Sequence, residues 1–182
     1  MAVMKFITKN HPNSKYKTKY QDDMAYADLI RYVFDPKKTN HFIGGWGVDT
    51  KYADYEMAMV TYLYHKEKGV KLRHWVVSFT REDLIHLEER SHQEFQYSLG
   101  YIGYQLTSFY LNRYQIVFGV HWVDEDFPHI HIIMNTTSYM DGKKFHGDRN
   151  EYHDYELFAK QVLANYGLPL FITKDHRSSK YY

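Results

Sequence analysis

Three histidines in the middle of the chain carry its clearest chemistry. In the segment HWVDEDFPHIHIIMN, His129 and His131 are two residues apart in a stretch with the pattern of a strand, so both imidazoles leave the same face. His121 ends the preceding predicted strand, and the loop between them can fold it back beside the pair. Three neutral imidazoles converging from a hairpin leave coordination positions open, as a catalytic metal requires.

The residues around the histidines bear on this interpretation. An isolated His-x-His pair can simply face solvent on an edge strand. Here the apolar neighbours Ile130, Ile132 and Ile133 favour an interior strand, in which buried histidines need partners. Asp124 or Asp126, in the loop, could accept the second ring proton of a ligand histidine. We therefore predict a metal site at the hairpin.

The elements that must position this site follow from hydrophobic spacing and from turn residues. Strands that alternate with helices, together with a hairpin over 114–135, predict an α+β fold, a two-layer α/β sandwich with a mainly antiparallel sheet. Within the strand 71–79, residues Trp75, Val77 and Phe79 share one face. The predicted strands are Val3–Thr8, Lys71–Phe79, Tyr114–His121 and Pro128–Asn135. The predicted helices are Asp23–Val33, Tyr52–Lys68 (apolar at Tyr55, Ala58, Met59, Tyr62 and Leu63), Arg81–Leu111 with a break near Gly100, and Tyr152–Tyr166, and the predicted loops are Lys9–Tyr20 and Lys37–Thr50.

Composition sets the class of protein. The 182 residues are 44% hydrophobic and 25% charged, which fits one ordered globular domain. The absence of cysteine excludes a disulfide framework and a thiolate metal site. No apolar run approaches the length of a membrane span, and the N-terminus lacks the apolar core of a signal peptide. With a net charge of +1, any binding of nucleic acid must use a local basic patch.

Three segments resemble, in the same order, the motifs of conjugative and mobilization relaxases, the MobP-like group of the HUH endonuclease superfamily. They are DLIRYVFDPKKT (Asp28–Thr39), HWVVSF (His74–Phe79) and VHWVDEDFPHIHIIMNT (Val120–Thr136). The resemblance spans roughly residues 25 to 170 and implies an HUH relaxase-like fold for a single domain over residues 1–182. We expect the chain to be either the catalytic fragment of a longer protein or a minimal nuclease.

The resemblance also implies a reaction, the site- and strand-specific nicking of DNA at the origin of transfer of a plasmid or integrative element. Tyr32 would attack a DNA phosphate and form a 5′-phosphotyrosine link. A metal held by His121, His129 and His131 would activate the phosphate. Mn or Mg is expected to support activity, and imidazole ligands also suit Zn, Co or Ni.

Choosing one tyrosine among 19 needs further argument. Tyr26, Ile30 and Val33 share one helical face, which is expected to lie in the core. Tyr32 lies off that face and is freer to meet a substrate. Tyr26 is the reserve nucleophile.

Contacts with DNA are expected from local groups. Lysines neutralise phosphates without reading sequence, and the resemblance adds a serine and an asparagine. The expected partners are single-stranded DNA at an origin of transfer and accessory relaxosome and coupling proteins, in the bacterial cytoplasm and without a membrane. The candidate residues are Lys37, Lys38, Lys143, Lys144, Ser78 and Asn135, with Lys15, Lys17 and Lys19 near the N-terminus.

Three other functions compete with this interpretation. A rolling-circle replication initiator or a single-tyrosine transposase of the same superfamily also pairs histidines with tyrosine. Those enzymes usually place the tyrosine after the histidines, whereas Tyr32 precedes them. A non-catalytic, metal-stabilised DNA-binding module would not depend on Tyr32. A metal-dependent hydrolase that uses water would leave no link between protein and DNA.

Overall fold

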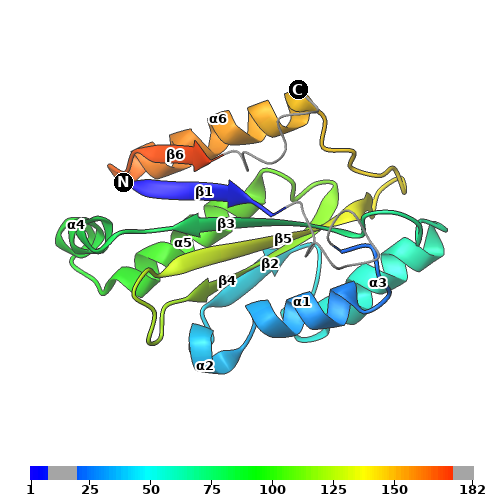
Figure 1. The fold of residues 1–182 in the computed structure, drawn as a ribbon, viewed down its shortest axis with the longest axis horizontal. Coiled ribbons are helices and arrows are strands. Elements are labelled where there is room, and N and C mark those ends of the chain that lie inside the picture. Colours follow the sequence, from blue (N-terminus) through cyan, green and yellow to red (C-terminus); the bar gives the residue numbers. More distant parts are fainter. Residues whose placement is uncertain (8–19, 174–182) are drawn as a thin grey trace.

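The computed structural model describes residues 1–7 and 20–173, and these form an α+β domain around a six-stranded sheet (Figure 1). The strand order is β2-β4-β5-β3-β1-β6, and neighbouring strands are antiparallel except for the parallel pair β1 and β6. The predicted fold class is therefore confirmed. Lys15, Lys17 and Lys19 lie outside the described residues, as does most of the predicted loop 9–20. The strands are β1 (Ala2–Phe6), β2 (Ile43–Trp46), β3 (Leu72–Ser78), β4 (Tyr114–His121), β5 (His129–Ser138) and β6 (Leu170–Thr173).

Helices cover both faces of the sheet, so a partial third layer is added to the two that were expected. The larger core lies between one face and the helices α4, α5 and α6, and the smaller core lies between the other face and α1 and α3. In Figure 1, α1 and α3 run across the lower part of the near face. The helices are α1 (Ala25–Val33), α2 (Pro36–Thr39), α3 (Ala53–Leu63), α4 (Arg81–Ser91), α5 (Phe95–Ser108) and α6 (Arg149–Asn165), with a 3-10 turn η1 (Thr50–Tyr52).

The hairpin of β4 and β5 sets the register of the histidines. His121 lies directly opposite His129, and Gly119 lies opposite His131. Every residue of β4 is buried, as expected for a central strand covered on both faces. Alternation then sends Ile130 and Ile132 into the larger core, while the histidines project from the opposite face.

Helix α1 ends where the sequence predicts. Residue Asp35 precedes Pro36, and a residue before proline is disfavoured in helical conformation. Pro36 instead begins the short helix α2, where the side chain of Asp35 accepts a hydrogen bond from the backbone N–H of Lys37 at 3.0 Å. Tyr32 is thereby held in the last turn of α1, just before a sharp change of chain direction.

The predictions for residues 37–50 and 81–111 were wrong in part. The segment 37–50 is not all loop, because it contains α2 and the edge strand β2. A Cβ on Gly44 would lie 2.6 Å from the Phe118 ring, so this glycine serves close packing and not a turn. The long predicted helix breaks at residues 92–94 and not at Gly100, since His92 adopts a left-handed backbone (φ 54°) that ends α4.

Helix α3 is shorter than predicted and presents a different face. Tyr55, Tyr62 and Leu63, which were placed on its apolar stripe, are exposed. The buried residues are Ala53, Met57 and Thr61, because Ala53 and Met57 pack in the smaller core while Thr61 joins a buried polar network. None of the helices in the described part of the chain is long and apolar enough to cross a membrane.

Gly119 lets α1 approach the sheet. A Cβ at this position would lie 2.3 Å from the carbonyl oxygen of Val33 and 3.0 Å from Cγ1 of the same residue. Any side chain would therefore push away the end of α1, which carries Tyr32. The absence of a side chain allows the backbone of α1 to come into contact with β4.

We predict that Gly119→Ala destabilises the protein by about 1–3 kcal/mol, because the added methyl group meets backbone atoms that cannot move independently of α1. Urea unfolding would measure the change. Gly100→Ala in α5 is the matched control, since its Cβ would meet only ordinary contacts at 3.4 Å and alanine favours a helix. Equal stabilities for the two variants would contradict the argument.

Candidate metal centre and active site

The three predicted ligands, His121, His129 and His131, come together on one face of the hairpin. One ring nitrogen from each can be chosen so that all three lie within 4.8 Å of one another. The ring centroids of His121 and His131 are 4.4 Å apart, and those of His129 and His131 are 4.7 Å apart. His121 and His131 are buried, whereas His129 is half-buried. The centre is therefore open on one side.

Backbone carbonyls orient two of these rings. The Nε2 of His121 lies 3.1 Å from the carbonyl oxygen of Val33, and a carbonyl only accepts, so Nε2 carries the hydrogen. Its Nδ1 then carries the lone pair, and this atom is buried with no hydrogen-bond partner in the described part of the chain. Likewise, Nδ1 of His129 donates to the carbonyl oxygen of Phe127 at 2.9 Å, which leaves the lone pair on Nε2.

These observations fit a bound divalent cation. A buried nitrogen lone pair without a donor is costly unless something accepts its electrons. His121 Nδ1, His129 Nε2 and His131 Nε2 are the three atoms that would hold the cation, and a three-histidine set leaves positions for substrate. These are the three histidines predicted from the sequence, and their binding of a metal stays a prediction.

Burial favours the neutral form of His121 and His131, which is the form that binds a metal. Burial is the main cause that lowers the pKa of His131 below its ordinary value, and the neighbouring imidazoles His74, His121 and His129 lower it further. Burial also lowers the pKa of His121, against a smaller opposing effect of the hydrogen bond to Val33.

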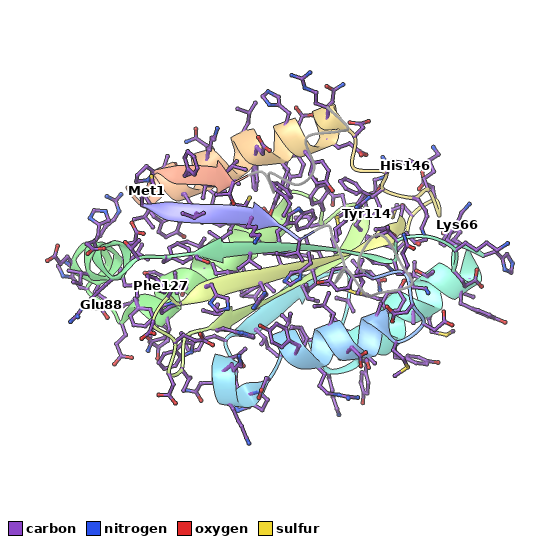
Figure 2. All side chains as sticks on the ribbon, in the orientation of Figure 1. Met1, Lys66, Glu88, Tyr114, Phe127 and His146 are labelled. Atoms are coloured by element: carbon purple, nitrogen blue, oxygen red, sulfur yellow. The ribbon has the colours of Figure 1, made fainter. Side chains whose placement is uncertain are left out.

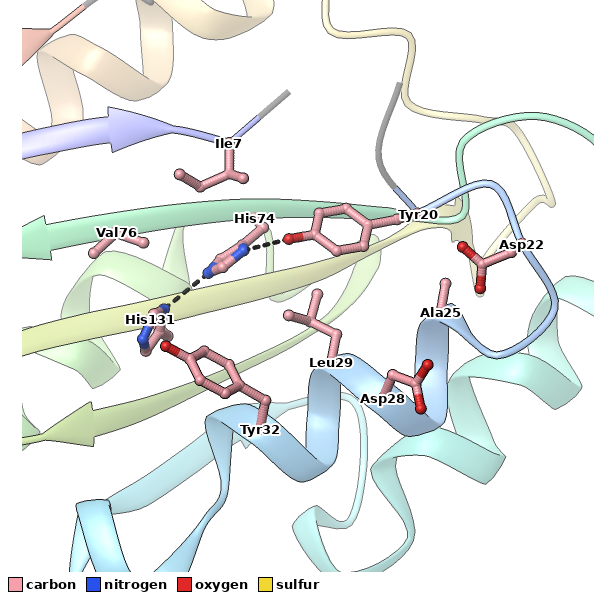
Figure 3. Close-up of a pocket in the computed structure, with 10 residues that line it drawn as sticks. All are labelled: Ile7, Tyr20, Asp22, Ala25, Asp28, Leu29, Tyr32, His74, Val76 and His131. Atoms are coloured by element: carbon pink, nitrogen blue, oxygen red, sulfur yellow. Dashed lines mark hydrogen bonds between the residues drawn. The ribbon is translucent and has the colours of Figure 1, made fainter. Parts of the chain in front are cut away.

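Tyr32 lies against this centre. Its ring centroid is 5.3 Å from that of His121 and 5.2 Å from that of His131, both in edge-to-face contact. The side chain is 45% exposed, and Figure 3 shows its hydroxyl directed toward His131. A half-exposed phenol beside three imidazoles can reach both a substrate and the metal centre.

Lys38 is positioned at the same place by α2. The backbone N–H groups of Trp122 and Val123 both donate to the carbonyl oxygen of Lys38, which ties α2 to the loop after β4. The Nζ atom of Lys38 lies 5.4 Å from the ring centroid of Tyr32 and 3.4 Å from Oε1 of Glu125. A positive charge therefore stands next to the tyrosine. Lys37, the other predicted lysine of α2, is exposed.

The predicted acidic support of the metal site is not observed. Within residues 1–7 and 20–173, neither Asp124 nor Asp126 hydrogen bonds to a ligand histidine. Both line a pocket of about 360 Å³ beside His129 and Ser78. Two carbonyls and an imidazole take the ring hydrogen-bonding positions instead, so this prediction is corrected.

Two further candidates lie in the core. Tyr26 is buried and its hydroxyl is 2.6 Å from Oγ1 of Thr61, while burial raises its pKa to about 12. Asn135 is fully buried, accepts from Thr61 and donates to the carbonyl oxygen of Met57. Asn135 therefore has no exposed surface for DNA and instead anchors α3 to β5, and Tyr26 is less accessible than Tyr32.

Lys143 and Lys144 lie at the other end of the sheet from the histidines. Lys144 donates to the carbonyl oxygens of Lys68 and Val70, and Lys143 pairs with Asp141 at 3.3 Å. They line a basic pocket with Lys66, Tyr114 and His146, and Figure 2 shows those three at the opposite end of the molecule from Phe127. These lysines are thus remote from Tyr32.

Two residues at the site carry no role in the sequence-based prediction. His74 hydrogen bonds through Nε2 to Nδ1 of His131 at 2.8 Å and through Nδ1 to the hydroxyl of Tyr20 at 2.7 Å (Figure 3). The two residues, His74 and Tyr20, line a pocket of about 500 Å³ with Tyr32 and His131. Alternation places His74 on the same face as Ser78, and that spacing was the signal that could have identified it.

Comparison with protein families identifies the chain. The family model described as "Relaxase: MobA/VirD2-like, nuclease domain" matches residues 32–168, more than half of the sequence. The match includes Tyr32 and all three histidines. No curated protein and no solved structure matches. The resemblance predicted from the three motifs is therefore confirmed at the level of the family.

The neutral, buried ligands predict how stability depends on pH without metal. Below about pH 6.5 the unfolded chain protonates His121 and His131 while the folded protein does not, so stability falls as pH decreases. The slope is expected to approach about 1.4 kcal/mol per pH unit for His131, and His121 adds to it in the same direction. Urea unfolding in chelator between pH 5 and 7.5 would measure it.

His131→Gln should lose its share of this slope, whereas His153→Gln, a change of an exposed histidine on α6, should not. A slope that is the same in wild type and His131→Gln would contradict the assignment of neutral, buried ligands.

Proposed function

Because the chain belongs to the MobA/VirD2-like family of relaxase nuclease domains, we propose that it nicks one DNA strand at an origin of transfer through Tyr32. The observation that carries this proposal is the contact of the exposed Tyr32 ring with His121 and His131. Family membership supports a nuclease that acts on DNA. The choice of tyrosine, the origin of transfer and the covalent link are our inferences.

The proposed reaction is a transesterification. The hydroxyl oxygen of Tyr32 bonds to phosphorus while the bond from phosphorus to the 3′ oxygen breaks. The net proton transfer is from the phenol to the leaving 3′ oxygen. The product is a 5′-phosphotyrosine and a free 3′-hydroxyl, and the reverse reaction rejoins the strand because the phosphodiester is exchanged and not hydrolysed.

We propose that His121, His129 and His131 hold a divalent cation, with Mn or Mg as the first choice and Zn, Co or Ni as others that suit imidazole. Bound there, the cation would polarise the scissile phosphate and stabilise the charge that develops on it. The protein's own contribution is to hold Tyr32 beside that position through Gly119 and to keep the imidazoles neutral.

We propose that a single strand crosses the site along two pockets on the face of the sheet that carries the histidines. The pocket that contains Tyr32 and His131 and the pocket that contains Ser78 and His129 share Val76 as a lining residue. Ser78 lines the second pocket and Lys37 and Lys38 lie on α2, and we propose that these three residues contact the strand near the nick. Lys143 and Lys144 lie beside Ser138 and Thr137 at the end of β5, about 20 Å from His131 along the strand, so we propose that they contact more distant phosphates.

The proposed function also implies where the protein acts and with which partners. Such a nickase would act in the bacterial cytoplasm on a plasmid or integrative element, together with accessory relaxosome and coupling proteins. It would serve mobilization and conjugation, and thus horizontal gene transfer.

Removal of the lysine beside Tyr32 should weaken DNA binding in a salt-dependent way. Lys38→Gln is expected to make the slope of log K against log salt shallower by about 0.7 for a single strand, the loss of one phosphate contact. Fluorescence anisotropy with a labelled strand at several salt concentrations would measure it. Lys160→Gln, an exposed lysine of α6 behind the sheet, is the control. Equal slopes in the two variants would exclude a phosphate contact by Lys38.

The decisive test is for an SDS-resistant adduct between protein and DNA. The protein and Mn²⁺ would be incubated with labelled single strands tiled across the DNA that flanks its gene. We expect an adduct on one strand that disappears in Tyr32→Phe and on chelation, with Tyr62→Phe, an exposed tyrosine of α3, as the matched control.

The other outcomes point to the alternatives. An adduct that survives Tyr32→Phe would move the nucleophile, with Tyr26 as the next residue to replace. Nicks without an adduct would indicate a hydrolase that uses water. Metal binding with neither nicks nor adducts would indicate a non-catalytic DNA-binding module.

A further inference from the structure

A row of hydrogen bonds connects the metal centre to the chain before α1. Nε2 of His129 lies 3.1 Å from Nε2 of His131, Nδ1 of His131 lies 2.8 Å from Nε2 of His74, and Nδ1 of His74 lies 2.7 Å from the Tyr20 hydroxyl. We propose that His74 is a positioning residue for the metal. Metal binding replaces the hydrogen bond between His129 and His131 and reverses the direction of the two hydrogen bonds of His74. The inference rests on the proposed metal site.

The direction in the metal-free protein follows from one fixed end. His129 donates through Nδ1 to the carbonyl of Phe127, so its Nε2 carries a lone pair. With neutral imidazoles, His131 must then donate through Nε2, which leaves Nδ1 as an acceptor. His74 in turn donates through Nε2 to His131, and its Nδ1 accepts from the hydroxyl of Tyr20. Each nitrogen in the row thus has one assigned role.

Metal binding requires the opposite direction in the two hydrogen bonds of His74. The Nε2 of His131 must offer its lone pair to the cation, so the hydrogen moves to Nδ1 and is donated to His74. His74 must accept through Nε2, so its hydrogen moves to Nδ1 and is donated to the oxygen of Tyr20. The hydroxyl hydrogen of Tyr20 then turns away from His74. One binding event therefore fixes the tautomers of two histidines and the rotation of one hydroxyl.

The surroundings make His74 suited to this role. Its side chain is buried, and it projects from β3 two residues before Val76, the residue opposite His131. A carboxylate is a common partner of a ligand histidine, but here the partner is an imidazole, which can act as donor or acceptor. His74 can therefore satisfy His131 both before and after metal binding.

Histidine nitrogen chemical shifts would test the reversal in the wild-type protein. Long-range ¹H–¹⁵N spectra at pH 7.5 distinguish the two neutral tautomers, and Zn²⁺ is a diamagnetic probe. We expect His74 to change from the Nε2–H form without metal to the Nδ1–H form with one equivalent of Zn²⁺. A tautomer of His74 that is the same in both states would overturn the reversal.

Variants would test the positioning role by calorimetric titration of tag-free protein with Zn²⁺. His74→Leu removes the acceptor and should weaken Zn²⁺ binding about 10- to 100-fold. His74→Gln keeps an acceptor and a donor and should restore most of the affinity. Tyr20→Phe, which removes the hydroxyl that hydrogen bonds to His74, should lose about 2- to 10-fold in affinity. Tyr155→Phe, behind the sheet, is the matched control and should bind as wild type does.

The outcomes separate this inference from the proposed function. If wild type does not bind Zn²⁺, or if His129→Ala does not weaken binding, the metal site itself is wrong. If wild type binds Zn²⁺ and both His74 variants bind it as tightly as wild type does, only the positioning role is overturned. If His74→Leu does not fold, two measurements remain. Zn²⁺ binding by Tyr20→Phe that is as tight as in wild type, together with an unchanged His74 tautomer in the wild-type spectra, would overturn the positioning role.

Discussion

The close approach of α1 to β4 at Gly119 determines the geometry of the site. Without a Cβ at Gly119, the carbonyl of Val33 reaches His121 and fixes its ring, and the preceding residue, Tyr32, lies against His121 and His131. One contact therefore both orients a metal ligand and positions the nucleophile. A shift of α1 by the thickness of a methyl group would disturb both, because the same backbone carries them.

The hairpin gives the centre its rigidity. His121 and His129 are cross-strand partners, and a side chain on an interior strand can change face only if the whole register slips. Buried isoleucines on the opposite face of β5 oppose such a slip, since it would expose them. The apolar alternation of one face thus holds the imidazoles of the other face in place, and a bound cation would add little to the order of the backbone.

Much of this arrangement could be predicted from the sequence, since the hairpin, the histidine set and the exposure of Tyr32 follow from local periodicity. What escaped prediction depends on contacts between distant segments. The acidic loop residues Asp124 and Asp126 are close to the histidines in sequence, yet carbonyls and His74 take their expected place. Asn135 ends a motif, yet tertiary packing buries it under α3. Nothing local distinguishes a glycine that permits a close approach from one that forms a turn.

Two of the three ligand histidines are oriented by groups that can only accept a hydrogen bond. A backbone carbonyl always accepts, so Val33 and Phe127 fix the hydrogens of His121 and His129 whether or not a metal is bound. His131 is different, because both of its neighbours are imidazoles that can donate or accept. Two ligands are thus preorganised and the third is adjustable. His131 also contacts Tyr32. The ligand whose tautomer changes on metal binding is therefore one that lies against the proposed nucleophile.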